Sequence, residues 1–399
     1  MSTGHRCDQR LLGSWRSDST APAANDGSTV GIVSRVLLPP IDHRSRVVAL
    51  TERLCERNAA AFLVTDLTDV RWLTGFTGSN GWVVVGNDRI VLGTDGRYLD
   101  RARDETAGSA VEVIAERVPA KLWERLVELC GGATVVELDP AAVTHAMWDR
   151  LVTELPIKAS VSPIVELRRR KDDAEIARIE AAAEAADAAL AEVEPLLLAT
   201  VDEPITEHDV RIELEYRMRR HGADDRSYNT IVAAGPVHAA RPHHEVSRRT
   251  IVDGDMVIID VGGLVDGYHS DMTRSWVIGD PTAQQREMFE LTAASQQAGL
   301  NALKAGVAAV DVDSACRACY VEAGYGDWFL HGTGHGVGLQ IHESPFHSQV
   351  STETLIAGDV VTIEPGLYRN GVGGVRIEDL AVVTGTGHRV LTHAPQRKL

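Results

Sequence analysis

The stretch from His331 to Glu343 reads HGTGHGVGLQIHE and constrains this chain more than any other. It holds three histidines and four glycines in thirteen residues. Glycine costs backbone entropy and lets the chain pass close to another group, so the stretch is poor material for a core helix or a central strand. Imidazoles offer neutral ligands or proton carriers near pH 7. We interpret the stretch as a loop that presents one metal ligand and two substrate-facing imidazoles. A flexible glycine loop with incidental histidines is the alternative.

The composition of the whole chain narrows the class of protein. Its 399 residues are enough for two domains, each with a core. Forty Lys and Arg side chains against 57 Asp and Glu give a formal net charge of −17. An acidic surface repels phosphate backbones, so we do not expect nucleic acid as a partner. No apolar run approaches the ~20 residues of a membrane span, so we expect no membrane association.

The five cysteines form an odd and sparse set. Such a set does not resemble a disulfide framework, so we expect a reducing, cytoplasmic environment. Cys316 and Cys319 form a CxxC, but no second ligand pair follows at zinc spacing. We interpret them as two small buried thiols on an amphipathic helix.

Three segments divide the chain. Residues 1–40 include a tail rich in Ser, Thr, Ala and Gly, for which we predict a disordered extension. From 41 to 164, apolar strand-like runs alternate with helical patterns and predict an α/β domain. A basic run followed by two aspartates then suits the start of a long helix, and we place the junction at about 165–173. From 165 to 399, helices beside an antiparallel sheet predict an α+β domain.

Two aspartates flank a hairpin signal in the second domain. Asp266-Gly267 is a strong two-residue turn between apolar alternating runs. With that turn, Val265 faces Tyr268 and Asp260 faces Thr273. Asp271 then lies on the same face as Asp260, as its diagonal neighbour, roughly 7–8 Å away along the backbone. Because a buried carboxylate without a partner is costly, we expect the two to share a function. Solvated strand aspartates are the alternative.

A second acidic pair follows near the C-terminus. Glu364 lies in TIEPG and Glu378 in VRIED, each within an apolar strand-like run. Arg376 shares a strand face with Glu378, so a structural salt bridge would account for Glu378. It would not account for Glu364, whose following Pro-Gly marks a bulge or turn.

These carboxylates and the histidine of the glycine-rich stretch form a chemically coherent set. Four converging carboxylates cannot all ionise in a dry site without cations. Two divalent ions would neutralise them, and oxygen-rich ligation with one imidazole favours Mn²⁺, Co²⁺ or Fe²⁺. Two such ions can activate a water for hydrolysis. The set consists of Asp260, Asp271, His335, Glu364 and Glu378.

The pieces IDVGG, HSDMTR, HGTGHGVGL, TIEPGLY and VRIED, in this order, resemble the "pita-bread" metallopeptidases. That family includes methionine aminopeptidase, Xaa-Pro aminopeptidase, prolidase and creatinase. TGFTGSNG and TDGRY resemble the creatinase/prolidase N-terminal domain, which methionine aminopeptidase lacks. The resemblance implies an α/β N-terminal domain of creatinase/prolidase type, followed by an α+β pita-bread catalytic domain.

The resemblance also assigns roles. It implies that Asp260 and Asp271 hold one metal ion, that Asp271, His335 and Glu364 hold the other, and that Glu378 bridges. Mn²⁺ is expected first, with Co²⁺, Fe²⁺ or Zn²⁺ as alternatives. Glu364 would also take the proton from a metal-bridging water. The other residues carried over from the family are the catalytic imidazoles His243 and His342, His331 in the proline pocket, and Tyr368 and Arg376, which support the site.

One segment departs from the family pattern. GPVHAARPHH is one residue longer than usual, with His238 near a position usually held by Asn. This leaves His243 and His244 as alternatives for the imidazole that faces the site, and we choose His243 because it follows Pro242.

We expect a metal-dependent exopeptidase that cleaves the bond between an N-terminal residue and proline. The short form of the family favours Xaa-Pro aminopeptidase over its rival, Xaa-Pro dipeptidase (prolidase). A metal-free binding module and a hydrolase of non-peptide amides are the other classes. Proline-containing peptides are the expected substrates, and the family implies a homodimer or a higher homo-oligomer.

Overall fold

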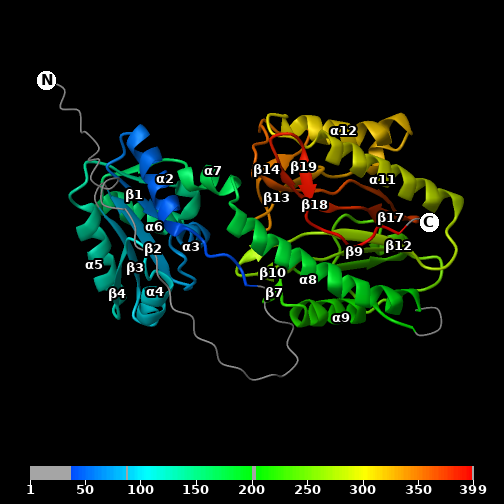
Figure 1. Cartoon of the computed structure of the whole chain (residues 1–399), viewed down its shortest axis with the longest axis horizontal. Helices are drawn as coiled ribbons and strands as arrows, with labels where there is room; N and C mark the ends of the chain where they lie inside the picture. The colour runs from blue at the N-terminus through cyan, green and yellow to red at the C-terminus, as the bar shows by residue number, and fades with distance from the viewer. Residues whose placement is uncertain (1–36, 87–88, 200–203, 398–399) are drawn as a thin grey trace. The chain divides into compact units, whose positions relative to one another are not determined.

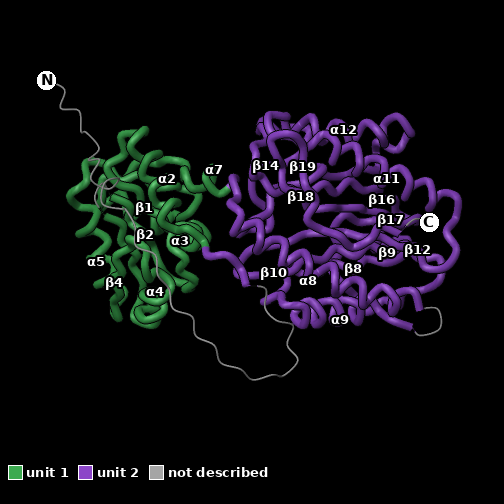
Figure 2. Tube along the Cα trace, viewed as in Figure 1, with its two compact units in different colours: residues 1–28, 41–168 green, residues 29–40, 169–399 purple. Residues whose placement is uncertain are grey.

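The computed structural model describes residues 37–86, 89–199 and 204–397. The chain separates into two compact units, the first from Ile41 to Arg168 and the second from Arg169 onward, with residues 37–40 belonging to the second (Figure 2). This division falls inside the junction expected at about 165–173. Most of the extension predicted for 1–40 lies outside the described residues.

The first unit is a mixed six-stranded sheet with helices, ordered β4-β3-β2-β1-β5-β6 (Figure 1). Strand β1 runs antiparallel to β2 and parallel to β5, and β3 runs parallel to β4. Its strands are β1 (Ala61–Val64), β2 (Gly81–Gly86), β3 (Ile90–Asp95), β4 (Val111–Glu116), β5 (Val136–Leu138) and β6 (Ile157–Ala159). Its helices are α2 (His43–Glu56), α3 (Leu67–Thr74), α4 (Leu99–Glu105), α5 (Pro119–Cys130), the 3₁₀ turn η1 (Pro140–Ala142), α6 (His145–Glu154) and α7 (Pro163–Arg169).

The second unit begins with a long helix and alternates helices with short strands. The helices are α8 (Asp173–Leu198), α9 (Glu207–Arg220), α10 (Gly235–His238), α11 (Ala283–Ala302), α12 (Ala309–Glu322) and the 3₁₀ turn η2 (Gly326–Trp328). Asp172 caps α8 in a reciprocal bond with Glu175, as the acidic start predicted. The helix continues past Pro195 to Leu198.

The strands of the second unit form several small antiparallel sheets. Three strands pair in the order β12-β9-β8, three in the order β11-β10-β7, and five in the order β14-β13-β15-β18-β19, while β16 pairs with β17. Their bounds are β7 (Asp225–Arg226), β8 (Ile231–Ala234), β9 (Met256–Asp260), β10 (Gly263–Val265), β11 (Tyr268–His269), β12 (Thr273–Val277), β13 (Gly334–Gly336), β14 (Glu343–His347), β15 (Val360–Ile363), β16 (Gly366–Arg369), β17 (Gly373–Arg376), β18 (Asp379–Val383) and β19 (His388–Val390).

Strand β9 shows how the layers position the site. Val257 and Ile259 pack against apolar residues of α8 and α9, whereas Met256 and Ile258 pack in a second cluster with α11, α12, β16 and β17. Figure 1 shows α8 and α9 on one side of the strands and α11 and α12 on the other. Because side chains alternate along a strand, Asp260 continues the row of Met256 and Ile258. It therefore ends β9 on the face turned toward β17.

Two global expectations can be compared with the structure. No helix in the described part of the chain combines the length and apolarity that crossing a bilayer demands. Cys130, Cys316 and Cys319 are free, whereas Cys55 is disulfide-bonded. Cys316 is buried and Cys319 only half-buried on α12.

Candidate metal centre

The β-hairpin places Asp260 and Asp271 as the sequence predicted. Val265 pairs with Tyr268 and Asp260 with Thr273, so the register is the one set by the two-residue turn. Asp266 and Gly267 have φ values of 45° and 76°, the positive pair that a type I′ turn requires. The Tyr228 hydroxyl lies within hydrogen-bond distance of one oxygen of each aspartate. The two carboxylates therefore converge on one point.

Glu364 and Glu378 lie at two breaks in one long hairpin. Strand β15 pairs with β18 up to Ile363 and Asp379, and β16 pairs with β17 from Gly366 and Arg376. Between these pairings, Glu364-Pro365 interrupts one arm and Ile377-Glu378 the other. The break after Glu364 was predicted from its Pro-Gly, whereas the break at Glu378 falls within a run that the sequence indicated only as strand-like. The two breaks lie opposite each other in the hairpin, so the side chains of Glu364 and Glu378 need not follow the alternation of the strands.

His335 lies on a strand, not in a loop. It is the middle residue of β13, which pairs with β14 on one side and β15 on the other. We predicted a loop and judged the stretch poor material for a central strand, and for Gly334–Gly336 that prediction is wrong. Its glycines serve close backbone approach: a Cβ on Gly334 would lie 2.1 Å from the Thr362 carbonyl oxygen, and one on Gly336 would lie 2.4 Å from that of Ser344.

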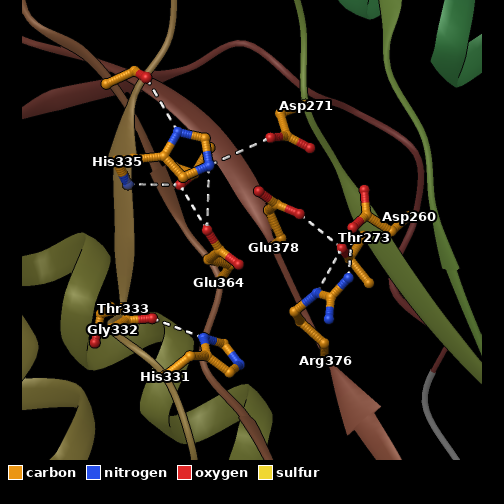
Figure 3. A network of polar contacts seen from close by, with 12 residues as sticks. Asp260, Asp271, Thr273, His331, Gly332, Thr333, His335, Glu364, Arg376 and Glu378 are labelled. Atoms are coloured by element: carbon orange, nitrogen blue, oxygen red, sulfur yellow. Dashed lines mark hydrogen bonds and ion pairs between the residues drawn. The ribbon is translucent and has the colours of Figure 1, made fainter. Parts of the chain in front are cut away.

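The predicted ligand set meets in one place (Figure 3). Ligand oxygens of Asp260, Asp271 and Glu378 lie within 4.8 Å of one another. His335 Nε2 lies 3.6 Å from Asp271 Oδ2 and 3.4 Å from Glu364 Oε1. Asp271 thus belongs both to the group with Asp260 and Glu378 and to the group around His335, so the cluster offers two adjoining positions for metal ions.

The electrostatics of the cluster favour cation binding. Burial raises the pKa of Asp271 well above its ordinary value, and the charges of Asp260 and Glu364 raise it further. Burial also raises the pKa of Glu378 well above its ordinary value, and the charge of Asp271 raises it further. Burial also raises the pKa of Glu364 and lowers that of His335, which keeps the imidazole neutral. Buried acids that resist ionisation beside a neutral imidazole fit divalent cations, whose charge would relieve the repulsion.

Arg376 organises one side of the cluster. Its guanidinium donates to Asp260 Oδ2, to Thr273 Oγ1 at 3.0 Å and to the Pro242 carbonyl oxygen at 2.9 Å. The ion pair that the sequence suggested between Arg376 and Glu378 is thus replaced by one with Asp260. Thr273 carries the connection onward, because its hydroxyl donates to Glu378 Oε2 at 2.6 Å.

Except for Tyr368, the remaining predicted residues line the same cavity as the cluster, which has a volume of about 730 Å³. His243, His331 and His342 are among its walls, as is Arg376. The rings of His335 and His342 meet edge-on with centroids 4.4 Å apart. Tyr368 is buried, and its hydroxyl lies 3.0 Å from both His331 Nε2 and Arg376 Nη1.

The structure also separates the two adjacent histidines. His243 is exposed and lines the cavity, whereas His244 is buried and hydrogen-bonded to Glu207. Of the two alternatives left by the sequence, the one that faces the cavity is His243.

The sequence-based prediction missed two residues of the site. Tyr228 contacts both aspartates, and Thr273 connects Arg376 with Glu378. Thr273 could have been found from the sequence, since the predicted hairpin register already put it opposite Asp260. Tyr228 precedes an apolar strand and carried none, because its partners lie more than thirty residues ahead in the chain.

Comparisons with known proteins show which family this chain belongs to. Residues 177–385 match metallopeptidase family M24, and residues 46–170 match the creatinase/prolidase N-terminal domain. The Xaa-Pro dipeptidase of Pyrococcus furiosus is 32% identical over 361 residues, 89% of this chain and all of the relative. Among solved structures, an Xaa-Pro dipeptidase from Bacillus anthracis superposes with a TM-score of 0.84 at 31% identity, covering 89% of this chain and 99% of that one. An X-Pro aminopeptidase from Thermotoga maritima gives 0.79 at 30% identity, covering 88% and 98%.

This chain belongs to metallopeptidase family M24, and it combines a creatinase-type N-terminal domain with the pita-bread catalytic domain. It is therefore a metallopeptidase of the Xaa-Pro type, as the resemblance implied. The comparisons favour the dipeptidase alternative over the aminopeptidase that the sequence suggested first.

Proposed function

We propose that the protein is an Xaa-Pro dipeptidase whose cluster holds two divalent metal ions. The convergence of an imidazole and four carboxylates on one cavity is the observation that carries the proposal. Asp260 and Asp271 would hold one ion, and Asp271, His335 and Glu364 the other, with Glu378 shared. When bound, the ions would neutralise these carboxylates and activate a water for attack on the peptide carbonyl.

The chain's own residues would supply the rest of the chemistry. Glu364 is half-buried and its pKa is raised by burial, so its carboxylate is suited to take a proton from water and pass it to the leaving nitrogen. Burial lowers the pKa of His342 and of His331, so both imidazoles stay neutral and can donate a hydrogen bond to the substrate without carrying charge. Tyr368 fixes the His331 ring through their hydrogen bond.

The comparisons support the dipeptide preference. The Xaa-Pro dipeptidase of Pyrococcus furiosus matches this chain over its whole length. The Xaa-Pro dipeptidase from Bacillus anthracis has a higher TM-score than the X-Pro aminopeptidase from Thermotoga maritima. An Xaa-Pro aminopeptidase is the second candidate, because the Thermotoga maritima structure is nearly as similar. Both activities would use the same ligand set, so the difference lies in whether the cavity accepts residues after proline.

A direct assay separates the candidates. Protein loaded with Mn²⁺ is offered Xaa-Pro and Xaa-Pro-Yaa peptides side by side, and product release is followed by chromatography. Cleavage of the dipeptide alone is expected. Preferential cleavage of the tripeptide would support the aminopeptidase, and cleavage of neither, with no metal bound, would favour the binding module. Glu364→Gln is the matched control, because it removes the proposed proton carrier while keeping the side-chain shape.

Two finer points belong to the same proposal. The oxygen-rich donor set with one imidazole favours Mn²⁺ over the alternatives, and elemental analysis of protein purified without added metal tests this. The family implies a homodimer or higher homo-oligomer, which sedimentation of the full chain would reveal.

A further inference from the structure

Outside the metal centre, one buried carboxylate holds together a second polar cluster. Glu207 is the first residue of α9 and is fully buried. Its Oε1 accepts from the Ala234 backbone N–H at 2.9 Å and contacts His238 Nδ1 at 2.8 Å. Its Oε2 accepts from the backbone N–H and hydroxyl of Ser247, at 3.1 and 2.6 Å, and contacts His244 Nε2 at 3.2 Å.

These contacts lie on both sides of His243. Ala234 and His238 precede it in the chain, and His244 and Ser247 follow it. His243 itself makes none of the Glu207 contacts and instead lines the cavity. The neighbouring Pro242 carbonyl accepts from Arg376, and the Pro236 carbonyl accepts from the Gly371 N–H, so the segment has further fixed points. The exposed imidazole therefore sits on a loop whose two ends are tied to one carboxylate.

The geometry of the cluster favours hydrogen bonding over metal binding. The rings of His238 and His244 stack with centroids 4.1 Å apart and planes 23° apart. Two imidazole rings that bind the same ion spread apart around it. The rings of His238 and His244 instead lie nearly parallel. Both carboxylate oxygens already accept N–H or O–H donors from Ala234 and Ser247. Burial on its own raises the pKa of Glu207, but the hydrogen bonds from Ser247, His238 and Ala234 outweigh it and leave the pKa lowered, so the carboxylate is ionised.

We propose that Glu207 is a positioning residue, which sets the place of His243 in the cavity by tying both flanks of its loop to the start of α9. The proposal rests on the proposed function and on the catalytic role that the family resemblance gives to His243, which lines the cavity. An ionised carboxylate can accept from all these donors at once through its two oxygens. An amide keeps one accepting oxygen, and its NH₂ group, in place of the second oxygen, points two protons at the donors that this oxygen had bound.

The first test is a double-mutant cycle on the Mn²⁺-loaded full chain. Glu207→Gln is expected to lower kcat/KM by about 10- to 100-fold, because a misplacement of about 1 Å costs on this order. In the His243→Ala background, Glu207→Gln is expected to cost less than about twofold, since the group it positions is absent. Equal losses in both backgrounds would overturn the proposal, because Glu207 would then act independently of His243.

The second test needs no activity. Hydrogen exchange followed by mass spectrometry is expected to rise in residues 235–247 of Glu207→Gln and to stay unchanged in the strands that carry the metal ligands. Unchanged exchange in 235–247, or a rise across the whole chain, would overturn the proposal. If the wild-type protein cleaves no proline peptide, the proposed function fails, while this measurement still decides whether Glu207 fixes the loop.

Matched variants complete the design. Asp209→Asn changes a carboxylate in the same helical turn whose hydrogen bonds, within the described residues, go to Thr206, and it should leave 235–247 protected. If Glu207→Gln does not fold, His238→Asn and Ser247→Ala each remove one partner and should show smaller effects in the same direction. Elemental analysis covers the remaining possibility: loss of a metal ion from Glu207→Gln, with the main centre still filled, would overturn the proposal in favour of a separate metal site.

Discussion

The Thr273 hydroxyl lies 2.6 Å from Glu378 Oε2 and accepts the Nε–H of Arg376 at 3.0 Å. The neutral Thr273 side chain thus orients Glu378, a candidate metal ligand, and connects it to Arg376, which bonds Asp260. We expect Thr273→Val, which keeps the shape and removes the hydroxyl, to weaken metal affinity by about 10- to 100-fold, the range for groups that orient ligands. Competition titration with a metal indicator measures it.

Thr292 provides the control for that variant. It is equally buried, on α11. Thr292→Val should leave metal affinity within about twofold of wild type. Equal affinity of Thr273→Val and wild type would show that the hydroxyl does not orient Glu378.

The stability of the metal-free protein should fall as pH rises. Burial and neighbouring carboxylates raise the pKa values of Asp271 and Glu378 in the folded state. Such groups contribute stability below their unfolded pKa of about 4, and that contribution is lost as pH rises toward the folded values. Bound metal would remove the repulsion, so the gain in Tm on adding Mn²⁺ should grow between pH 5 and 8. A gain independent of pH would contradict this account, and Asp271→Asn should flatten the metal-free profile.

His347 should make the protein acid-sensitive. It is fully buried, and neither ring nitrogen has a hydrogen-bond partner within the described residues. Burial lowers its pKa to about 4. The unfolded chain binds a proton near pH 6.5 and the folded chain does not, so stability is lost as pH falls from about 6.5 to about 4, by up to about 3 kcal/mol.

The matching variant is His347→Leu, which removes the titrating group. It should be more stable than wild type at pH 5, by about 2 kcal/mol in urea unfolding, and less so at pH 8. His145 is exposed, so His145→Leu controls for the removal of a histidine that the fold does not bury. Parallel pH profiles for His347→Leu and wild type would refute the prediction.

The ion pair between Lys171 and Glu343 should be costly to break from one side. The two side chains are 1% and 8% exposed and 2.5 Å apart, and Glu343 directly follows the cavity residue His342. We expect Lys171→Met to destabilise the fold by about 3–5 kcal/mol, because it leaves a buried carboxylate without its cation. Lys171→Met with Glu343→Leu should recover most of that loss in chemical unfolding. Arg53→Met, which breaks an exposed pair, should cost less than about 1 kcal/mol.

The parts of the site that follow from local rules were predictable from the sequence. The Asp266-Gly267 turn fixes the hairpin register, and the register places Asp260 and Asp271 on one face. The Pro after Glu364 predicted the break that frees that side chain. In each case the deciding interaction lies within a few residues of the group it positions.

The parts that depend on distant backbone were not predictable. The glycines around His335 suggested a loop, but they admit the carbonyls of Thr362 and Ser344 and so allow an interior strand. Tyr228 and Glu207 gained their roles from segments that meet them only in the folded chain. No local pattern marks a tyrosine or glutamate whose partners lie elsewhere.

The two-residue turn between β10 and β11 has a consequence for how this protein can diverge. Surface turns commonly accept insertions, but here one added residue would rotate every side chain on one arm to the opposite face. Asp271 would point away while Asp260 stayed in place, and the centre would be dismantled by a change at a half-buried hairpin tip. The length of this turn is thus as tightly constrained as the identity of the acids it brings together.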